Sequence, residues 1–291
     1  MTDKMFNREE YPLDILGAFG LTENMIYDLP GYIHENIEAG GLSPLLPITV
    51  EQPFGYSHCY AKFCLVKLED GIGVMFSPKL KTADLSYITE AERELLSEGK
   101  AIVADVEENV MTGPGQEKKE KIKAFVQLDQ DTNNVVYVPS QIIGRNIRTI
   151  SEEFNLPEEA LQGFWEGKLV TLNLSDGDNP VMNLTIGINL FTAKGIAMVP
   201  GDAERWNIIE HRAMPEYSFG NDGCWVNRHG VLSYVPEEKF TQDILDALDK
   251  QARQAGMQSD YDNARDISRE HRYDEDTEQA RQMTRQTGKT I

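Results

Sequence analysis

The chain has 291 residues, enough for about two domains or one elongated repeat array with an ample core. It carries 48 acidic against 28 basic residues, and the formal net charge of −20 repels phosphate backbones and argues against general nucleic-acid binding. This charge fits a basic protein partner, or solubility alone. Three cysteines are too few for a disulfide framework and indicate a reducing compartment.

Neither a signal peptide nor a membrane span is expected from the sequence. The first ten residues lack the apolar segment of a signal peptide. No run of 18 apolar residues occurs, so no segment is predicted to cross a bilayer. We therefore expect a cytoplasmic protein that makes no membrane contact.

The N-terminal part contains signals for short helices followed by strands. Pro12 begins a predicted helix, and Gly20 ends it. A second helix is predicted to open at residues 21–23. The apolar run 45–50 leads into the first strands, and residues 60–68 alternate between apolar and polar side chains as a strand does.

A turn, an apolar run and a proline recur four times along the chain. The turns contain residues that tolerate positive φ, and each proline ends a strand because it removes a ladder donor. The first three prolines follow each other at intervals of 61 residues, and the fourth follows after 36, so the last unit is predicted to be truncated. These four structural positions are Pro78, Pro139, Pro200 and Pro236.

A short helix that ends in glycine precedes the second hairpin. Thr89 followed by Glu92 is a capping-box pattern. Leu95 and Leu96 are predicted to form its buried side. Gly99 suits the left-handed position just after a helix.

A second copy of this helix starts at Pro157, which takes the first-turn position. Leu161, Phe164 and Trp165 are predicted to face inward. Gly167 ends the helix, and a lysine and a strand follow it, as they do after Gly99. The order of elements predicts that residues 89–139 and 157–200 are duplicated helix-and-hairpin units. A weaker copy ends at Gly40-Gly41.

Six stretches share a pattern with a known group of proteins: residues 19–23, 45–50, 61–65, 70–71, 125–129 and the Glu-x-x-x-Leu-x-x-Gly-Lys helix at 92–100. They resemble uncharacterised repeat-containing proteins carried by bacterial conjugative transposons. The resemblance covers roughly residues 10–145 and continues more weakly to Pro200. In that group such modules are often fused or adjacent to a type I topoisomerase, which implies a role in DNA transfer or processing. The acidic balance and the absence of a topoisomerase portion depart from the group.

One locally basic segment interrupts the pattern. Residues 111–123 are interpreted as a loop around Thr112-Gly-Pro-Gly-Gln, followed by a lysine run. The segment is the candidate partner-binding surface, and the alternative is an ordinary solvated loop. Its basic residues are Lys118, Lys119, Lys121, Lys123, Arg145 and Arg148.

The C-terminal half continues with a strand and a helix. Residues 181–190 alternate cleanly, as expected for an antiparallel strand with one solvated side. Residues 236–256 carry apolar side chains at helical spacing, which predicts an amphipathic helix. From Met257 onward the periodicity fails, so the tail is predicted to be disordered unless a partner orders it.

Motifs for phosphate binding and metal binding are incomplete. Gly99-Lys100 and Gly167-Lys168 lack both the preceding glycine and the following Ser or Thr of a P-loop, so helix ends are the better interpretation. Cys59 and Cys64, beside His58, differ by an odd number along a strand and point to opposite faces. The sequence therefore predicts neither a cofactor nor a metal site.

Signals for catalysis are equally weak. Cys224 and His229 straddle a predicted hairpin, but no orienting acid accompanies them, so a buried cysteine beside Trp225 is favoured. The acidic pairs 152–153 and 158–159 are placed at helix starts, where carboxylates complement the helix dipole. No catalytic residue is predicted.

These observations predict an α+β fold of short helices and antiparallel hairpins in repeated units, closed by a C-terminal amphipathic helix. The leading functional hypothesis is a non-catalytic interaction module of a mobile genetic element, which predicts an exposed apolar patch. The alternatives are an acidic inhibitor or nucleic-acid mimic, which predicts carboxylates arrayed on one face, and a hydrolase. The predicted segments are 1–85, 86–145, 146–256 and the tail 257–291.

Overall fold

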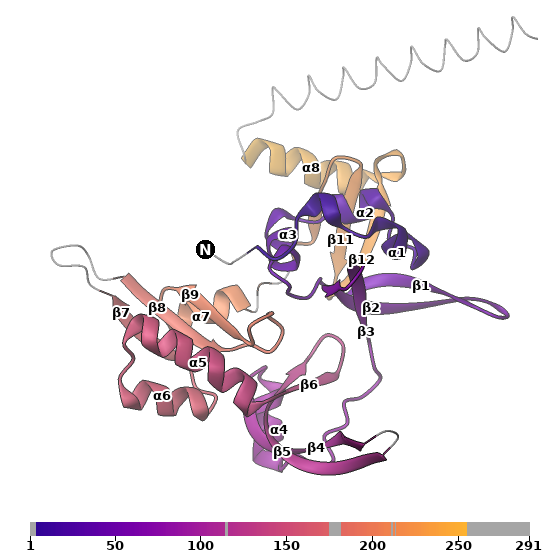
Figure 1. Cartoon of the computed structure of the whole chain (residues 1–291). Coiled ribbons are helices and arrows are strands. Elements are labelled where there is room, and N and C mark those ends of the chain that lie inside the picture. Colours follow the sequence, from indigo (N-terminus) through magenta and orange to yellow (C-terminus); the bar gives the residue numbers. More distant parts are fainter. Residues whose placement is uncertain (1–3, 114–115, 175–181, 211, 213, 255–291) are drawn as a thin grey trace, which may run out of the picture. The chain divides into compact units, whose positions relative to one another are not determined.

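The structure is a computed structural model that describes residues 4–113, 116–174, 182–210, 212 and 214–254 (Figure 1). The chain divides into two compact units, Met1–Tyr234 and Val235–Ile291. Short helices alternate with antiparallel sheets, which confirms the predicted α+β class. The predicted tail 257–291 and the last two residues of the helix predicted over 236–256 lie outside the described residues.

The first unit begins with short helices, whose ends are set by a capping hydrogen bond and by a glycine. The Thr22 hydroxyl accepts a hydrogen bond from the Met25 N–H and caps a helix start, and Gly20, with φ of +80°, follows the first helix. Both predicted helices are thus present. The elements are the 3₁₀ turn η1 (Arg8–Glu10), α1 (Leu13–Ala18), α2 (Glu23–Tyr27) and α3 (Gly31–Glu38).

An antiparallel three-stranded meander occurs four times in the described residues (Figure 1). In each sheet the strands pair in sequence order, so the middle strand bonds to both neighbours. The last strand ends at a proline in every meander, at the four predicted positions. The strands are β1 (Leu46–Gln52), β2 (Gly55–Leu68), β3 (Gly71–Pro78), β4 (Ile102–Gly113), β5 (Gln116–Asp129), β6 (Asn134–Pro139), β7 (Val170–Leu174), β8 (Met182–Ile188), β9 (Ile196–Pro200), β10 (Tyr217–Phe219), β11 (Gly223–Arg228) and β12 (Val231–Pro236).

The register of the first three meanders supports the predicted repeat. The terminal proline lies opposite a residue of the middle strand that also pairs with the first strand. In β2 this residue is Ala61, in β5 it is Ala124 and in β8 it is Leu184. The strand order is the same in residues 89–139 and 157–200, as duplication requires.

The helices that precede these meanders end in the same way. Each is followed by a left-handed glycine, Gly40, Gly99 or Gly167, with φ of +83°, +79° and +71°. The glycine N–H bonds three residues back, and the next N–H bonds five residues back, which is the Schellman pattern. The predicted conformation of Gly99 and Gly167 is therefore confirmed. The helices are α3, α4 (Glu90–Ser97) and α6 (Glu158–Trp165).

The last meander is shorter than the others but complete. It follows α7 (Ala203–Glu210) and has three strands, the first of only three residues. Between Pro200 and Pro236 the described chain has one helix of eight residues and strands of three, six and six residues, whereas two helices precede the third meander. The last unit, predicted to be truncated, is thus shorter but keeps all three strands.

Three other local predictions are corrected. Residues 111–113 and 116–123 are not an interrupting loop, because they belong to the paired strands β4 and β5. Glu152-Glu153 lies at the end of α5 (Ser140–Phe154), a helix that was not predicted and that contains the proposed domain boundary at 145/146. Leu95 is 40% exposed, so Leu96 alone of this pair is buried.

Distinct apolar cores support the repeats. The first combines α1–α3 with residues of the first and last meanders. The second lies among one face of β4–β6, α5, α6 and β7–β9, and the third packs α4 on the other face of β4–β5. Phe125 belongs to the second core and its neighbour Val126 to the third, because successive strand residues point to opposite faces.

Asp28 joins the start of the first unit to its end. This buried carboxylate accepts hydrogen bonds from the N–H of Asn221 at 2.7 Å and Asp222 at 3.1 Å, and from the Tyr234 hydroxyl at 2.6 Å. A Cβ at Gly220 would lie 2.1 Å from the Asp28 Cγ, so only glycine fits there. These bonds connect residues about 200 positions apart in sequence.

The described part of the second unit contains the 3₁₀ turn η2 (Glu237–Lys239) and α8 (Gln242–Gln254). The amphipathic helix predicted over 236–256 is thus present over 242–254. None of the helices in the described ranges has the length and apolar content needed to cross a membrane.

The helix-ending glycines give a stability prediction. Gly99→Ala should destabilise by about 1 kcal/mol, because a Cβ is disfavoured at positive φ. Gly167→Ala should cost more, because its Cβ would also lie 2.5 Å from the Ala101 carbonyl oxygen, which is backbone and cannot rotate away. Urea denaturation of the purified variants measures both.

Lys100→Ala and Lys168→Ala are the matched controls, since these exposed lysines form surface ion pairs with Glu98 and Glu166. They should cost less than either glycine change, and added nucleotide should stabilise no variant. A nucleotide-dependent stabilisation that the lysine variants lose would show that the helix ends bind phosphate.

Candidate functional site

The predicted basic run lies on a two-stranded ribbon. Because β6 pairs with β5 only over Ala124–Asp129, the part of β5 before Ala124 pairs with β4 alone. Side chains alternate along a strand, so Lys119, Lys121 and Lys123 share one face and Lys118 lies on the other. The structure thus brings together three of the six predicted basic residues.

Carboxylates are interleaved with these lysines. Asp105 lies opposite Lys123, and Glu107 lies opposite Lys121. Lys119 Nζ is 3.7 Å from a Glu107 carboxylate oxygen. On the other face Lys118 Nζ is 3.0 Å from Glu120. The segment is therefore a ladder of alternating charge and not a positive patch.

The two predicted arginines belong to a different element. Arg145 and Arg148 lie on α5, whose first residue, Ser140, donates a hydrogen bond to the Lys123 carbonyl at 2.8 Å. Arg148 donates to the Gly144 carbonyl of its own helix. The start of the helix therefore lies beside the end of the basic run, but the helix does not extend the charge ladder.

A groove of about 920 Å³ runs beside β4 and contains two of the predicted lysines. Five consecutive β4 residues, 103–107, line it, together with Lys121 and Lys123. Tyr87 and Tyr137 line it as well, and both are partly exposed. This groove is the candidate binding site, because it joins cations, carboxylates and aromatic rings in one concave surface.

The hydroxyl of Tyr87 stays protonated over the physiological range. Burial raises its pKa above the ordinary value of 10.0, and the negative charge of Asp84 raises it further. The groove therefore offers a neutral phenol beside its lysines and carboxylates. None of these groups is arranged as a nucleophile with an orienting base.

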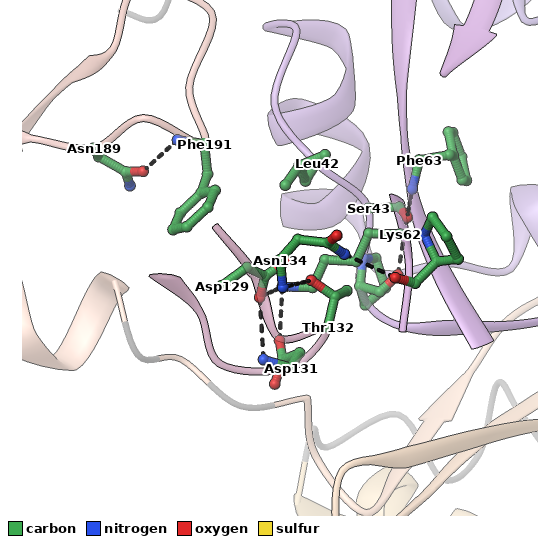
Figure 2. A network of polar contacts seen from close by, with 12 residues as sticks. Leu42, Ser43, Lys62, Phe63, Asp129, Asp131, Thr132, Asn134, Asn189 and Phe191 are labelled. Atoms are coloured by element: carbon green, nitrogen blue, oxygen red, sulfur yellow. Dashed lines mark hydrogen bonds and ion pairs between the residues drawn. The ribbon is translucent and has the colours of Figure 1, made fainter. Parts of the chain in front are cut away.

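A second polar cluster connects the first and second meanders (Figure 2). Lys62 Nζ of β2 contacts Asp129, the last residue of β5, at 2.8 Å and Asp131, in the turn that follows, at 2.7 Å. Asp129 is buried, and its Oδ2 has no hydrogen-bond partner among the described residues, so the Lys62 ammonium balances its charge. In the same turn the side-chain amide of Asn134 donates to the Pro78 carbonyl at 2.7 Å.

The turn after β5 has a counterpart after β8. Asp129 Oδ1 accepts from the N–H two residues on, at Asp131, and Asn189 Oδ1 accepts from the N–H of Phe191 in the same way (Figure 2). Gln127 then joins the two meanders, donating to the Gly99 carbonyl and accepting from the Leu190 N–H, both at 2.8 Å. These hydrogen bonds and ion pairs hold the turns of neighbouring meanders in position.

The cysteine and histidine candidates have structural explanations. Burial raises the pKa of the Cys224 thiol to about 11, so it is not a thiolate at neutral pH. His229 lies past the other end of β11, roughly 16 Å away along the strand. The His58 ring bonds to Thr49 at 3.1 Å, and Cys64 is buried on β2. Within the described residues, no group of three or more potential ligands could hold a metal ion.

His34 is a buried titratable group that the sequence did not single out. It is fully buried in α3 beside Tyr11 and near Glu38. Burial lowers its pKa below the ordinary value of 6.5, and the positive charge of Arg8 lowers it further. The folded chain therefore holds a neutral imidazole.

No protein family, curated protein or solved structure compared with this chain matches it.

The buried ion pair gives the next prediction. Lys62→Met should destabilise the chain by about 3 kcal/mol, because it leaves the buried Asp129 charge unpaired. Asp131→Asn, which removes the exposed carboxylate from the same lysine, should cost far less. Chemical denaturation measures each loss.

The double variant Lys62→Met/Asp129→Asn should lose less than the sum of its single changes, because no buried charge is left unpaired. Additive losses would mean that the two groups do not stabilise each other.

His34 gives a pH prediction. Its lowered pKa favours the neutral form in the folded state, so its contribution to stability is complete above pH 6.5 and is lost as pH falls through the lowered value. The parent chain should therefore lose more stability than His34→Gln between neutral and mildly acidic pH. Equal pH profiles of the two chains would contradict the assignment.

Proposed function

We propose that the chain is a non-catalytic protein-binding module of a mobile genetic element that acts through protein contacts in DNA transfer or processing. The mobile-element context rests on the resemblance of residues 10–145 to proteins of conjugative transposons. Protein binding is supported by the exposed aromatic side chains on the β1–β2 hairpin. With Cys59, Cys64 and Cys224 all free thiols, we expect it to act in the cytoplasm.

The β1–β2 hairpin extends past its sheet. β3 pairs with β2 only over Ala61–Leu68, so residues 47–60 form a two-stranded arm. At its tip the Phe54 side chain is fully exposed, and Tyr56 is 71% exposed. Aromatic side chains of this kind contribute much of the energy of protein interfaces once they are buried. Their exposure is the observation that carries the proposal.

The competing functions receive less support. An acidic mimic requires carboxylates arrayed on one face, whereas Asp105 and Glu107 lie opposite lysines. A hydrolase requires a nucleophile or paired acids in a cleft, and the groove beside β4 holds neither in a catalytic arrangement. The exposed aromatic arm fits the interaction module directly.

The test is a pull-down from the native host with the tagged full-length chain. Phe54→Ser/Tyr56→Ser should reduce capture of the partner at least tenfold while leaving the melting temperature unchanged, because neither side chain is packed. Ile208→Ser, which removes an apolar side chain 57% exposed on α7, is the control and should capture the partner as the parent does.

Two outcomes would contradict the proposal. The first is capture that is identical for the parent and the Phe54/Tyr56 variant. The second is tight, salt-sensitive binding of the parent to duplex DNA that is lost when Lys118, Lys119, Lys121 and Lys123 are changed to Glu.

A further inference from the structure

We propose that the outer edge of β4 binds an extended peptide of a partner protein by strand addition, and that this peptide carries basic side chains at alternate positions. The inference rests on the proposed protein-binding function and names the chemistry of the partner. It concerns the groove beside β4, which is separate from the aromatic arm.

The backbone of β4 is the first part of the argument. Within the described residues the strand order is β4-β5-β6, so β5 pairs with one edge of β4 and no strand pairs with the other. An outer edge presents N–H and C=O groups at every second residue, which are a template for another extended chain. The groove is lined by residues 103–107 of this strand, from both of its faces, together with Lys121 and Lys123 of β5 and Tyr137 of β6. An added strand would enter it along the β4 backbone.

The charged side chains on one face of β4 determine which charges a bound peptide must carry. Asp105 and Glu107 are exposed on this face, two residues apart. Side chains of an added strand would lie directly beside them, with Cβ atoms about 5 Å away. Lys121 and Lys123 lie one strand further, on β5, about 10 Å from the added strand. The nearest charges are therefore negative, and lysine or arginine at alternate positions would complete a ladder of alternating sign.

The other face of β4 sets the residues in between. Ala104 and Val106 lie there, and Val106 is buried in the core under α4. The Glu92 carboxylate on this side already accepts from the backbone and hydroxyl of Thr89, so it is engaged in the helix cap. Peptide side chains on this face would meet small and apolar neighbours. The expected pattern is thus basic, apolar, basic.

A second copy of the chain fits this edge poorly. Antiparallel pairing of β4 with β4 of another molecule would set Asp105 and Glu107 against the same carboxylates. Like charges directly opposite each other destabilise a strand pair. The net charge of −20 on each chain adds to this repulsion.

The probe is a fluorescein-labelled seven-residue peptide of alternating lysine and valine, titrated with the full-length chain and followed by fluorescence polarisation. It should bind at least tenfold more tightly than the same peptide with glutamate in place of lysine. Asp105→Asn/Glu107→Gln should reduce this preference at least fivefold. Glu152→Lys/Glu153→Lys, which changes exposed charge at the end of α5, is the control and should leave the preference above fivefold.

N-methylated peptides test the backbone part of the proposal without changing the protein. Only every second peptide N–H can face β4. Methylation of one alternate set should therefore reduce binding at least tenfold, and methylation of the other set should leave it within twofold. Equal effects of the two sets, equal binding of the lysine and glutamate peptides, or a dimer of the chain that the peptide cannot dissociate would overturn the inference.

The two proposals fail separately. If a partner is captured through Phe54 and Tyr56 but the peptide does not bind, the inference about β4 is wrong and the protein-binding function stands. If the peptide binds as expected and the Phe54/Tyr56 variant captures as the parent does, the aromatic arm is not the interaction site and the inference about β4 is supported.

Discussion

The fold of the first unit depends on the burial of the Asp28 carboxylate. Its two oxygens accept hydrogen bonds from the N–H groups of Asn221 and Asp222 and from the Tyr234 hydroxyl. A buried carboxylate is stable only when it is bonded in this way, so the helices at the start of the unit require the last meander. The Trp225 indole adds a bond to the Met25 carbonyl. The first and last meanders can then share one core, although most of the chain lies between them.

The middle meanders are held by bonds of the same kind at their turns. Lys62 neutralises the buried Asp129, and Gln127 joins the end of α4 to the turn after β8. These polar side chains connect the turns of neighbouring repeats to each other, in addition to the apolar contacts of the cores. In the second meander β5 pairs with one edge of β4, and α4 packs on one of its faces. No strand of the described residues pairs with the outer edge of β4.

The distribution of charge is one of the observations on which the proposed function rests. The chain is strongly acidic, yet on the β4–β5 ribbon each lysine has a carboxylate next to it or opposite it. Such a ladder supports the proposed protein-binding module more than a nucleic-acid mimic. An added strand would meet charges of alternating sign on this ribbon. The positions of its own charged side chains, and not its net charge, would then determine how well it binds.

The sequence by itself determined the local elements, because each depends on the conformational preferences of a few neighbouring residues. These elements are the helix caps at Thr89 and Gly99, the strands that end at Pro139 and Pro200, and the repetition of this order. It also contained the spacing of Ile143, Ile147 and Ile150, from which α5 could have been predicted. Only the tertiary structure decided that the lysine run is a strand, since its pairing with Asp105 and Glu107 lies across a hairpin. The structural roles of Asp28, Lys62 and Gln127 also could not be predicted from the sequence. The hydrogen-bond partners of a buried polar residue are distant in sequence, and only the folded structure identifies them.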